Sequence, residues 1–276
     1  MKKKAFFATL VVAGAMIAGC GATNNNTAAN NTSTSAAQTG QTIKVAADTT
    51  FPPFESEQNG KITGFDIAMI NAIAKQENLQ VDMSTMPFTG LIPALQTGQE
   101  DVAVAGITIK KTRMQAVNFS NAYYKSGLSI LVKTNSNIKG LSDLKGKLVA
   151  TKKGTSSVDL LTQKGITNVK QFDNIDDAYN ALETGGADAV VFDNPVNINF
   201  MNTHKNVHTV GGLLTGEYYG IAVSKKDTDL LNKINDGLKK IQADGEYAKL
   251  FNQYLGGDKS GLVSGVKDPA SVAVND

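Results

Sequence analysis

Apolar positions along this chain alternate between short continuous runs and longer segments with helical spacing. Runs typical of buried strands occupy residues 42–48, 79–86, 100–106, 126–134, 147–154, 168–173 and 187–195, with further strands expected within 207–225. Helical spacing occurs at residues 64–79, 88–98, 141–146, 155–165, 174–186 and 195–205, and residues 228–257 suit one long and one short helix. The succession of strand, helix and short apolar strand at 42–106 returns at 148–193. This pattern predicts an α/β protein with two lobes, each built on a parallel-type sheet.

The chain is expected to cross between the lobes twice, near residues 123–127 and 217–221. Both stretches contain glycine beside paired tyrosines, "YYKSG" and "EYYG", where a few backbone dihedral angles could absorb a hinge rotation. Residues 257–276 show no periodicity and are expected to form a loose C-terminal tail. The predicted lobes are residues 41–124 with 222–256, and residues 125–221.

The N-terminus differs from the rest of the chain. The segment "MKKKAFFATLVVAGAMIAGC" opens with lysines, continues with an uncharged apolar run over residues 5–18, and ends in small residues before Cys20. This order is typical of a secretory signal peptide over residues 1–20, and the run is shorter than the ~20 residues that a membrane-spanning helix needs. Residues 21–40 contain no charged, aromatic or large apolar residue, which predicts a flexible tether.

Composition narrows the range of functions. The 276 residues carry a formal net charge of +2, so the bulk charge gives no reason to expect a nucleic-acid partner. Cys20 is the only cysteine, which excludes an intramolecular disulfide, and no HExxH, GxSxG or P-loop sequence occurs. The exported part must therefore be stabilised by its core, and neither a cofactor nor a metal ion is expected.

Polar and aromatic side chains follow the predicted buried strands. In open α/β sheets, ligands bind outside the carboxyl ends of the strands. The residues at these positions include acids, bases, hydroxyls and aromatic rings: Asp48, Phe51, Phe88, Gly106, Thr108, Arg113, Lys152, Thr155, Ser156 and Asp193. Each one alone is as well explained as a surface charge, a loop cap or a core ring, and Thr155 or Ser156 would cap the helix that follows. Their common placement at strand ends is what predicts a single binding cleft.

This set of residue types suits a zwitterion. A planar guanidinium such as that of Arg113 binds a carboxylate through two hydrogen bonds. An ammonium has three donors, which a carboxylate, a hydroxyl and a backbone carbonyl can accept. Helix N-termini add amide donors for an anion, and aromatic walls exclude water. An arginine just after a buried strand therefore indicates a residue that grips an anionic group in a cleft.

Several segments carry a resemblance to a known family. They are "ADTTFPPFE", "GFDIAMINAIAK", "FTGLIPALQTG", "VAGITIKKTR", "NFSNAYYKSG" and "GKLVATKKGTSSVD", spread over residues 43–256. With these segments the chain resembles the solute-binding proteins of polar amino acid ABC importers, most of all the glutamine-binding members. The resemblance implies a two-lobe Venus-flytrap fold of the type II periplasmic-binding-protein class, with two hinge crossings, and a binding function without catalysis.

The resemblance also implies roles for the residues at the strand ends. Arg113 would bind the α-carboxylate of the ligand, helped by backbone amides near Thr108 and Ser156. Asp193, the Thr108 hydroxyl and the Gly106 carbonyl would bind the α-ammonium.

Four further residues would recognise the side chain of the ligand. Asp48 would meet the nitrogen of a side-chain amide, and Lys152 would meet its oxygen. Phe51 and Phe88 would enclose the aliphatic part.

Two positions depart from the glutamine-binding pattern. Phe192 stands where those members have a histidine near the ligand, and Ser156 stands where they have a glycine. The phenylalanine removes a polar partner and adds volume. An amino acid remains the expected ligand, with glutamine favoured and asparagine or a basic amino acid as alternatives.

The resemblance extends to location and partners. The sequence "IAGC" at residues 17–20 resembles the bacterial lipobox, in which the cysteine is lipidated and becomes the first residue of the mature protein. Cys20 would then anchor a monomer to the extracytoplasmic face of the cell membrane. There the protein would deliver a free amino acid to the ABC permease subunits.

Two other classes of protein remain open. An enzyme on the same scaffold, such as a cyclohexadienyl-type dehydratase acting on prephenate or arogenate, would need a general acid or base in the cleft. His204 and His208 lie in a turn-like stretch and are expected at the surface. An adhesin or a receptor for a sensor protein would keep the same cleft.

Overall fold

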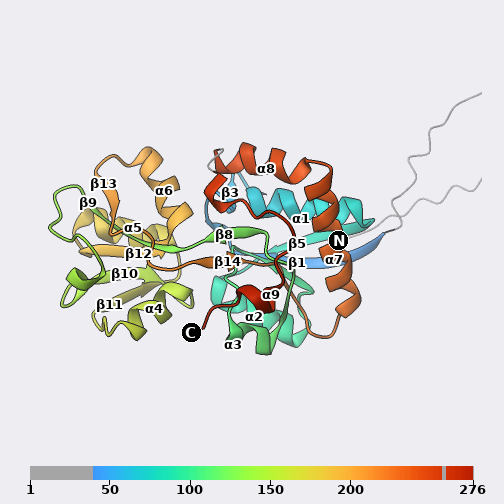
Figure 1. Ribbon diagram of the computed structural model, residues 1–276, viewed down its shortest axis with the longest axis horizontal. Helices are drawn as coiled ribbons and strands as arrows, with labels where there is room; N and C mark the ends of the chain where they lie inside the picture. The colour runs from blue at the N-terminus through green and yellow to red at the C-terminus, as the bar shows by residue number, and fades with distance from the viewer. Residues whose placement is uncertain (1–39, 257–258, 276) are drawn as a thin grey trace, which may run out of the picture. The chain divides into compact units, whose positions relative to one another are not determined.

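The computed structural model describes residues 40–256 and 259–275. The segments predicted to be a signal peptide and a tether, with the predicted lipidation site Cys20, lie outside the described residues up to residue 39. The first lobe is built on a sheet with the strand order β5-β1-β6-β15-β7 (Figure 1). Its strands are β1 (Gln41–Ala47), β5 (Leu79–Thr85), β6 (Val102–Val104), β7 (Asn118–Phe119) and β15 (Ala222–Val223). β1 runs parallel to β5 and β6, whereas β15 runs antiparallel to both β6 and β7.

Helices and a small antiparallel sheet complete the described part of the first lobe. The helices are α1 (Phe65–Gln76), α2 (Phe88–Thr97), α3 (Lys111–Ala116), α7 (Thr228–Ala243) and α8 (Glu246–Leu255), and the small sheet adds β2 (Thr50–Phe51), β3 (Glu55–Gln58) and β4 (Lys61–Thr63). In α1, Phe65, Met69 and Ile73 recur at helical spacing and are fully buried, and the helix packs against α7 and α8. Among the described residues, no helix has both the length and the apolar character to cross a membrane.

The second lobe repeats this plan with the strand order β11-β10-β12-β9-β13. Its strands are β9 (Leu128–Lys133), β10 (Val149–Lys152), β11 (Val169–Phe172), β12 (Ala189–Asp193) and β13 (Val207–Val210), and its helices are η1 (Leu141–Leu144), α4 (Ser156–Gln163), α5 (Ile175–Thr184) and α6 (Asn194–Thr203). β10, β11 and β12 are parallel, whereas β9 runs antiparallel to β12 and β13. The predicted two-lobe α/β fold is confirmed, but each sheet is mixed rather than wholly parallel.

Two connecting strands run between the lobes. β8 (Tyr124–Ser126) pairs antiparallel with β14 (Glu217–Tyr219), and the two lie side by side between the sheets (Figure 1). All strands of the second sheet lie between β8 and β14 in sequence, whereas β15 returns to the first sheet. The chain thus leaves the first lobe once and comes back once, which explains why both sheets contain antiparallel strands.

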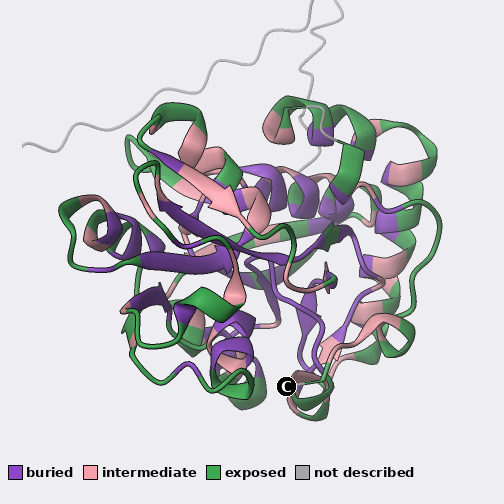
Figure 2. Cartoon of the chain, turned by 60° about the vertical axis from the view of Figure 1, so that its left-hand side comes forward, coloured by how far each residue is buried: buried purple, intermediate pink, exposed green. Residues whose placement is uncertain are grey.

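The strands form the buried layer of each lobe. Figure 2 shows most strand ribbons in the purple of buried residues, with green exposed residues along loops and outer helix faces. Every residue of β12 is buried, including its last residue Asp193. A strand buried on both faces reads as a continuous apolar run, as "AVVF" does here.

The C-terminal segment differs from the loose tail that the sequence suggested. Residues 259–275 contain a 3-10 turn, η2 (Lys259–Gly261), and a short helix, α9 (Pro269–Val272). Beyond α9, the backbone N–H of Val274 donates to the carbonyl of Ile109, and the N–H of Lys111 donates to the carbonyl of Val274, both over 3.0 Å. These bonds attach the segment to the first lobe, because Ile109 and Lys111 otherwise offer unpaired backbone groups at its edge.

Candidate ligand-binding site

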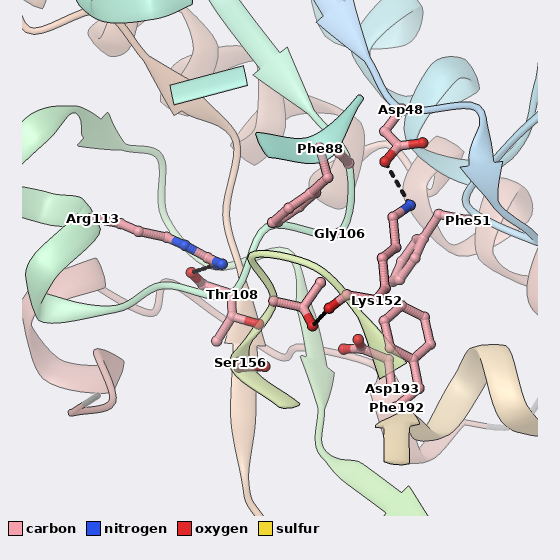
Figure 3. Close-up of a pocket in the computed structure, with 12 residues that line it drawn as sticks. Asp48, Phe51, Phe88, Gly106, Thr108, Arg113, Lys152, Ser156, Phe192 and Asp193 are labelled. Atoms are coloured by element: carbon pink, nitrogen blue, oxygen red, sulfur yellow. Dashed lines mark hydrogen bonds and ion pairs between the residues drawn. The ribbon is translucent and has the colours of Figure 1, made fainter. Parts of the chain in front are cut away.

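A pocket lies between the two lobes, where strands from both sheets end (Figure 3). Its lining comprises every candidate residue from the sequence, together with Ala105 and Phe192: Asp48, Phe51, Phe88, Gly106, Thr108, Arg113, Lys152, Thr155, Ser156 and Asp193. The space that these side chains leave measures about 10 Å³, roughly the room that one water molecule needs. A ligand of amino acid size would therefore have to replace contacts that the lining residues make with one another.

Strand topology explains why residues far apart in sequence meet at this pocket. Asp48 directly follows β1, and Gly106 lies just beyond β6, the parallel neighbour of β1. Lys152 and Asp193 are the last residues of β10 and β12, which are also parallel neighbours. Parallel neighbours end at the same edge of a sheet, so each lobe presents one such edge to the pocket.

A buried ion pair closes one end of the pocket. The Nζ atom of Lys152 lies 2.6 Å from Oδ2 of Asp48, and it donates to Oγ1 of Thr50 over 2.7 Å. Thr50 in turn donates from its backbone N–H and its hydroxyl to Oδ1 of Asp48. The side chains of Lys152 and Asp48 are only 1% and 4% exposed. Because the two charges compensate each other, this end of the pocket is close to neutral while still offering both a donor and an acceptor.

Arg113 spans the gap between the lobes. Its Nη1 atom donates to the backbone carbonyl of Thr108 over 2.9 Å, and its Nη2 atom donates to the carbonyl of Gly154 in the second lobe over 3.0 Å. The guanidinium carbon also lies 5.2 Å from the centre of the Phe88 ring, within the range of a cation–π contact. The guanidinium thus lies beside an aromatic ring, and two of its N–H groups are directed toward backbone carbonyls at the pocket.

Asp193 is the acidic counterpart of Arg113 in the second lobe. It is buried at 4% exposure and accepts a hydrogen bond from the hydroxyl of Tyr219 on a connecting strand. The pKa of Asp193 is raised to about 7: burial is the main cause and the negative charge of Glu217 adds to it, while the Tyr219 hydrogen bond and the Arg113 charge partly offset both. A cation placed beside Asp193 would favour its charged form.

Aromatic rings and a glycine shape the remaining walls. Phe51 from the first lobe meets Phe192 from the second edge to face, with ring centres 5.7 Å apart. Gly106 has a φ angle of 51°, and a Cβ atom there would lie 2.3 Å from the Phe51 ring. Its backbone N–H donates to the buried Asp66 over 3.0 Å. Only glycine therefore allows the backbone to approach this close to the aromatic wall.

Sequence reasoning missed Glu217, which touches this site from a connecting strand. Its carboxylate is 2% exposed and accepts hydrogen bonds from the hydroxyls of Thr108 and Ser156. Strand alternation could have indicated it, because residues two apart point to the same face. Glu217 and Tyr219 are both buried, whereas Tyr218 between them is partly exposed.

The histidines weighed as possible catalytic residues lie away from this pocket. Neither His204 nor His208 belongs to its lining. His204 directly follows the helix α6 and stacks on Phe200 of that helix, with ring centres 3.8 Å apart. Within residues 40–256 and 259–275, no group of three or more His, Cys, Asp or Glu side chains is arranged to hold a metal ion.

Comparisons with known proteins find relatives along most of the chain. Residues 43–257 match the family described as bacterial extracellular solute-binding proteins, family 3. A "Probable histidine-binding protein" of Neisseria gonorrhoeae is 33% identical over 261 residues, which cover 92% of this chain and 96% of the relative. The ABC transporter glutamine-binding protein of Bacillus subtilis is 35% identical over 216 residues, which cover 76% of this chain and 79% of the relative.

A solved structure agrees with these relatives. An ancestral arginine-binding protein bound to glutamine has a TM-score of 0.74 and 42% identity, covering 78% of this chain and 98% of that chain. All these names describe binding proteins and none describes an enzyme, so the comparisons favour binding over the dehydratase alternative. With its match over residues 43–257, this chain belongs to the bacterial extracellular solute-binding proteins of family 3.

Proposed function

We propose that this chain captures a free polar amino acid outside the cytoplasm and delivers it to an ABC importer. The observation that carries the proposal is the division of charge in the pocket, where Arg113 comes from the first lobe and Asp193 from the second. An α-amino acid carries a carboxylate and an ammonium on one carbon, so it can satisfy both side chains only when it lies between the lobes. The named relatives, which include a glutamine-binding protein of an ABC transporter, support the same function.

The contacts of Arg113 and Asp193 indicate how the α-groups would be held. Arg113 donates to two backbone carbonyls, and a ligand carboxylate is a stronger acceptor for the same fork of N–H groups. The N-terminus of α4 at Ser156 faces the same pocket and would supply backbone amide donors for that carboxylate. Asp193, once charged, would accept from the ammonium.

Glutamine is the amino acid that we propose as the preferred ligand. Its side-chain amide offers N–H donors to Asp48 and a carbonyl acceptor to Lys152, so both members of the ion pair would stay satisfied. A glutamate side chain would bring a second carboxylate to Asp48. An arginine side chain would bring a second cation to Lys152 in a site with almost no access to water. Phe192 packs against Phe51 in the lining and offers no polar group to a ligand, and asparagine or a basic amino acid is the alternative to glutamine.

Calorimetry against each of the twenty amino acids tests the proposed function. We expect glutamine to bind most tightly, and tighter binding of glutamate would contradict the assigned roles of Asp48 and Lys152. In Lys152→Met, Asp48 loses its cationic partner and its Oδ2 atom becomes an unpaired acceptor, so the ratio of glutamine to arginine affinity should fall by about 10-fold or more. An unchanged ratio in this variant would show that the ion pair does not distinguish between the side chains of the two ligands.

We further propose that Cys20 carries a lipid that holds a monomer at the membrane. The support is the order of lysines, apolar run and "IAGC" at the N-terminus. Detergent phase partitioning of the expressed full chain should place it in the detergent phase, and Cys20→Ala should move it to the aqueous phase. Partitioning of both forms into the aqueous phase would overturn the anchor without affecting the assignment of the pocket.

A further inference from the structure

Glu217 is a buried carboxylate on the connecting strand β14. Its Oε2 atom accepts hydrogen bonds from Oγ1 of Thr108 and Oγ of Ser156, each over 2.8 Å. Its Oε1 atom accepts from Oγ1 of Thr215 over 2.9 Å. With an exposed fraction of 2%, the carboxylate depends on these three hydroxyls in place of water.

The hydroxyls around Glu217 come from different parts of the molecule. Thr108 lies beyond β6 in the first lobe, and its backbone forms an isolated bridge with Tyr219. Ser156 is the first residue of α4 in the second lobe. One carboxylate oxygen therefore joins the two lobes at the strand that connects them. Any separation of the lobes must break at least one of these two bonds.

The same bonds determine how Thr108 and Ser156 face the pocket. A hydroxyl has one hydrogen, and here each hydroxyl donates it to Glu217. Both residues also line the pocket, where their oxygens have only lone pairs left to offer. They can accept a hydrogen bond from a ligand ammonium, but they cannot donate one to a ligand carboxylate.

We propose that Glu217 is a positioning residue that latches the two lobes together and orients Thr108 and Ser156 as acceptors for the α-ammonium of the ligand. This inference rests on the proposed binding of an amino acid in this pocket. It adds Glu217 to the residues that act in binding, and it assigns both hydroxyls the role of acceptors. Glu217 also lies close enough to Asp193 for its charge to raise the pKa of that carboxyl. Two neighbouring buried carboxylates are costly by themselves, and a cation between them relieves the cost.

The ion pair between Lys110 and Asp159 provides a matched control for the latch. It also crosses between the lobes, with Nζ and Oδ2 2.5 Å apart, but neither residue lines the ligand pocket. Asp159→Asn should weaken the contact between the lobes without changing how the pocket binds an ammonium group. Glu217→Gln keeps the shape of the side chain and removes its charge, and Ser156→Ala keeps Glu217 and removes one donor.

The latch is tested first without any amino acid. In the ligand-free protein the latch holds the lobes together in part of the population, so fluorescence energy transfer between dyes on the two lobes should report a larger mean separation in Glu217→Gln and in Ser156→Ala than in the unchanged protein. The shift in the double variant should be smaller than the sum of the two single shifts, because Ser156→Ala removes a hydrogen bond that Glu217→Gln already weakens by removing its charge. An unchanged distance in Ser156→Ala, or fully additive shifts in the double variant, would overturn the latch. This measurement stands even if glutamine proves not to bind.

The orientation of the hydroxyls is tested by comparing glutamine with its analogue 4-carbamoylbutanoate, which lacks the amine. Glu217→Gln should weaken glutamine binding by about 10- to 100-fold, the effect of losing hydrogen bonds organised by a charge, and should change analogue binding by less than about 2-fold relative to Asp159→Asn. Equal losses for glutamine and the analogue would overturn the orienting role. If the unchanged protein bound the analogue as tightly as glutamine, an ammonium site at Glu217 would be excluded.

Discussion

At the scale of single residues, Arg113 and Asp193 carry the opposite charges that the α-groups of an amino acid require. Replacing either one with alanine leaves the ligand group opposite it desolvated and unpaired. We expect a loss of about 2–5 kcal/mol, or roughly 30- to 5,000-fold in affinity, for every amino acid that the protein binds. Calorimetry on Arg113→Ala and Asp193→Ala measures this, with Asp159→Asn as a control outside the pocket. An affinity close to that of the unchanged protein would remove the residue from the site.

The raised pKa of Asp193 predicts that ligand binding releases a proton. With a pKa of about 7, the carboxyl is mostly protonated at about pH 6, whereas an ammonium ligand favours the charged form. Binding should therefore release about 0.9 proton at pH ~6 and about 0.1 at pH ~8. Calorimetry in buffers with different ionisation enthalpies measures the number of protons.

The raised pKa of Asp193 also makes the free energy of unfolding depend on pH. Because the folded protein holds the proton of Asp193 more tightly than the unfolded chain does, Asp193 lowers the free energy of unfolding as pH rises from about 4 to about 7.

Asp159→Asn is the control for proton release on ligand binding, and it should release the same number of protons as the unchanged protein. Absence of proton release at pH ~6 would show that Asp193 does not meet the ammonium.

At the scale of elements, the sequence predicted the strands and helices that have an apolar run or an apolar face and missed short polar strands. β12 is a continuous apolar run and α1 has a regular apolar face, so each carries its own signal. The small sheet of β2, β3 and β4 was missed, because its strands are two to four residues long and mostly polar. Such strands are stabilised by pairing with their neighbours, and they are too short to show an alternation of apolar and polar residues in the sequence.

The C-terminal segment follows the same rule and allows a direct test. Val274 donates its N–H to Ile109, and the preceding residue Ala273 already has the extended backbone that a following proline needs. Val274→Pro should therefore remove one hydrogen bond and lower the free energy of unfolding by about 1–3 kcal/mol. Thermal denaturation should show a lower Tm for Val274→Pro than for Val274→Ala, which keeps the N–H. Equal Tm values for Val274→Pro and Val274→Ala would show that the Val274 hydrogen bond does not stabilise the fold, as expected for a loose tail.

At the scale of the whole described chain, binding and lobe contact depend on the same residues. Arg113 already reaches Gly154 across the gap, and Lys152 reaches Thr50. A ligand held by side chains from both lobes has a higher affinity for the arrangement in which the lobes meet, so it should shift the population toward that arrangement. We propose that β8 and β14 act as the hinge, since they are the strands that cross between the lobes.

Small-angle scattering tests this motion. Saturating glutamine should reduce the radius of gyration, while circular dichroism should show unchanged secondary structure. Arg113→Ala is expected to show no compaction at the same glutamine concentration. A radius of gyration that stays the same in the unchanged protein at saturation would exclude closure as the signal to the transporter.

The sequence alone determined the two-lobe α/β plan and the residues of the pocket. Periodicity is a local property, and strand ends can be read from where apolar runs stop, as at Asp48 and Asp193. Neighbouring parallel strands end at the same edge of a sheet, so the residues that follow these strands could be expected to lie near one another. The family resemblance supplied the roles that this list lacked.

Only the tertiary structure decided which of these residues pair with one another. Lys152 bonds to Thr50 across 102 positions of sequence, and Thr108 bonds to Glu217 across 109 positions. No local pattern encodes such partners, because the choice depends on how two separate lobes and a connecting strand pack. Burial then makes the choice consequential, since a buried charge must find a partner within the protein rather than in water. For that reason the ion pair at Asp48 and the hydrogen bonds of Glu217 became apparent only in the folded chain.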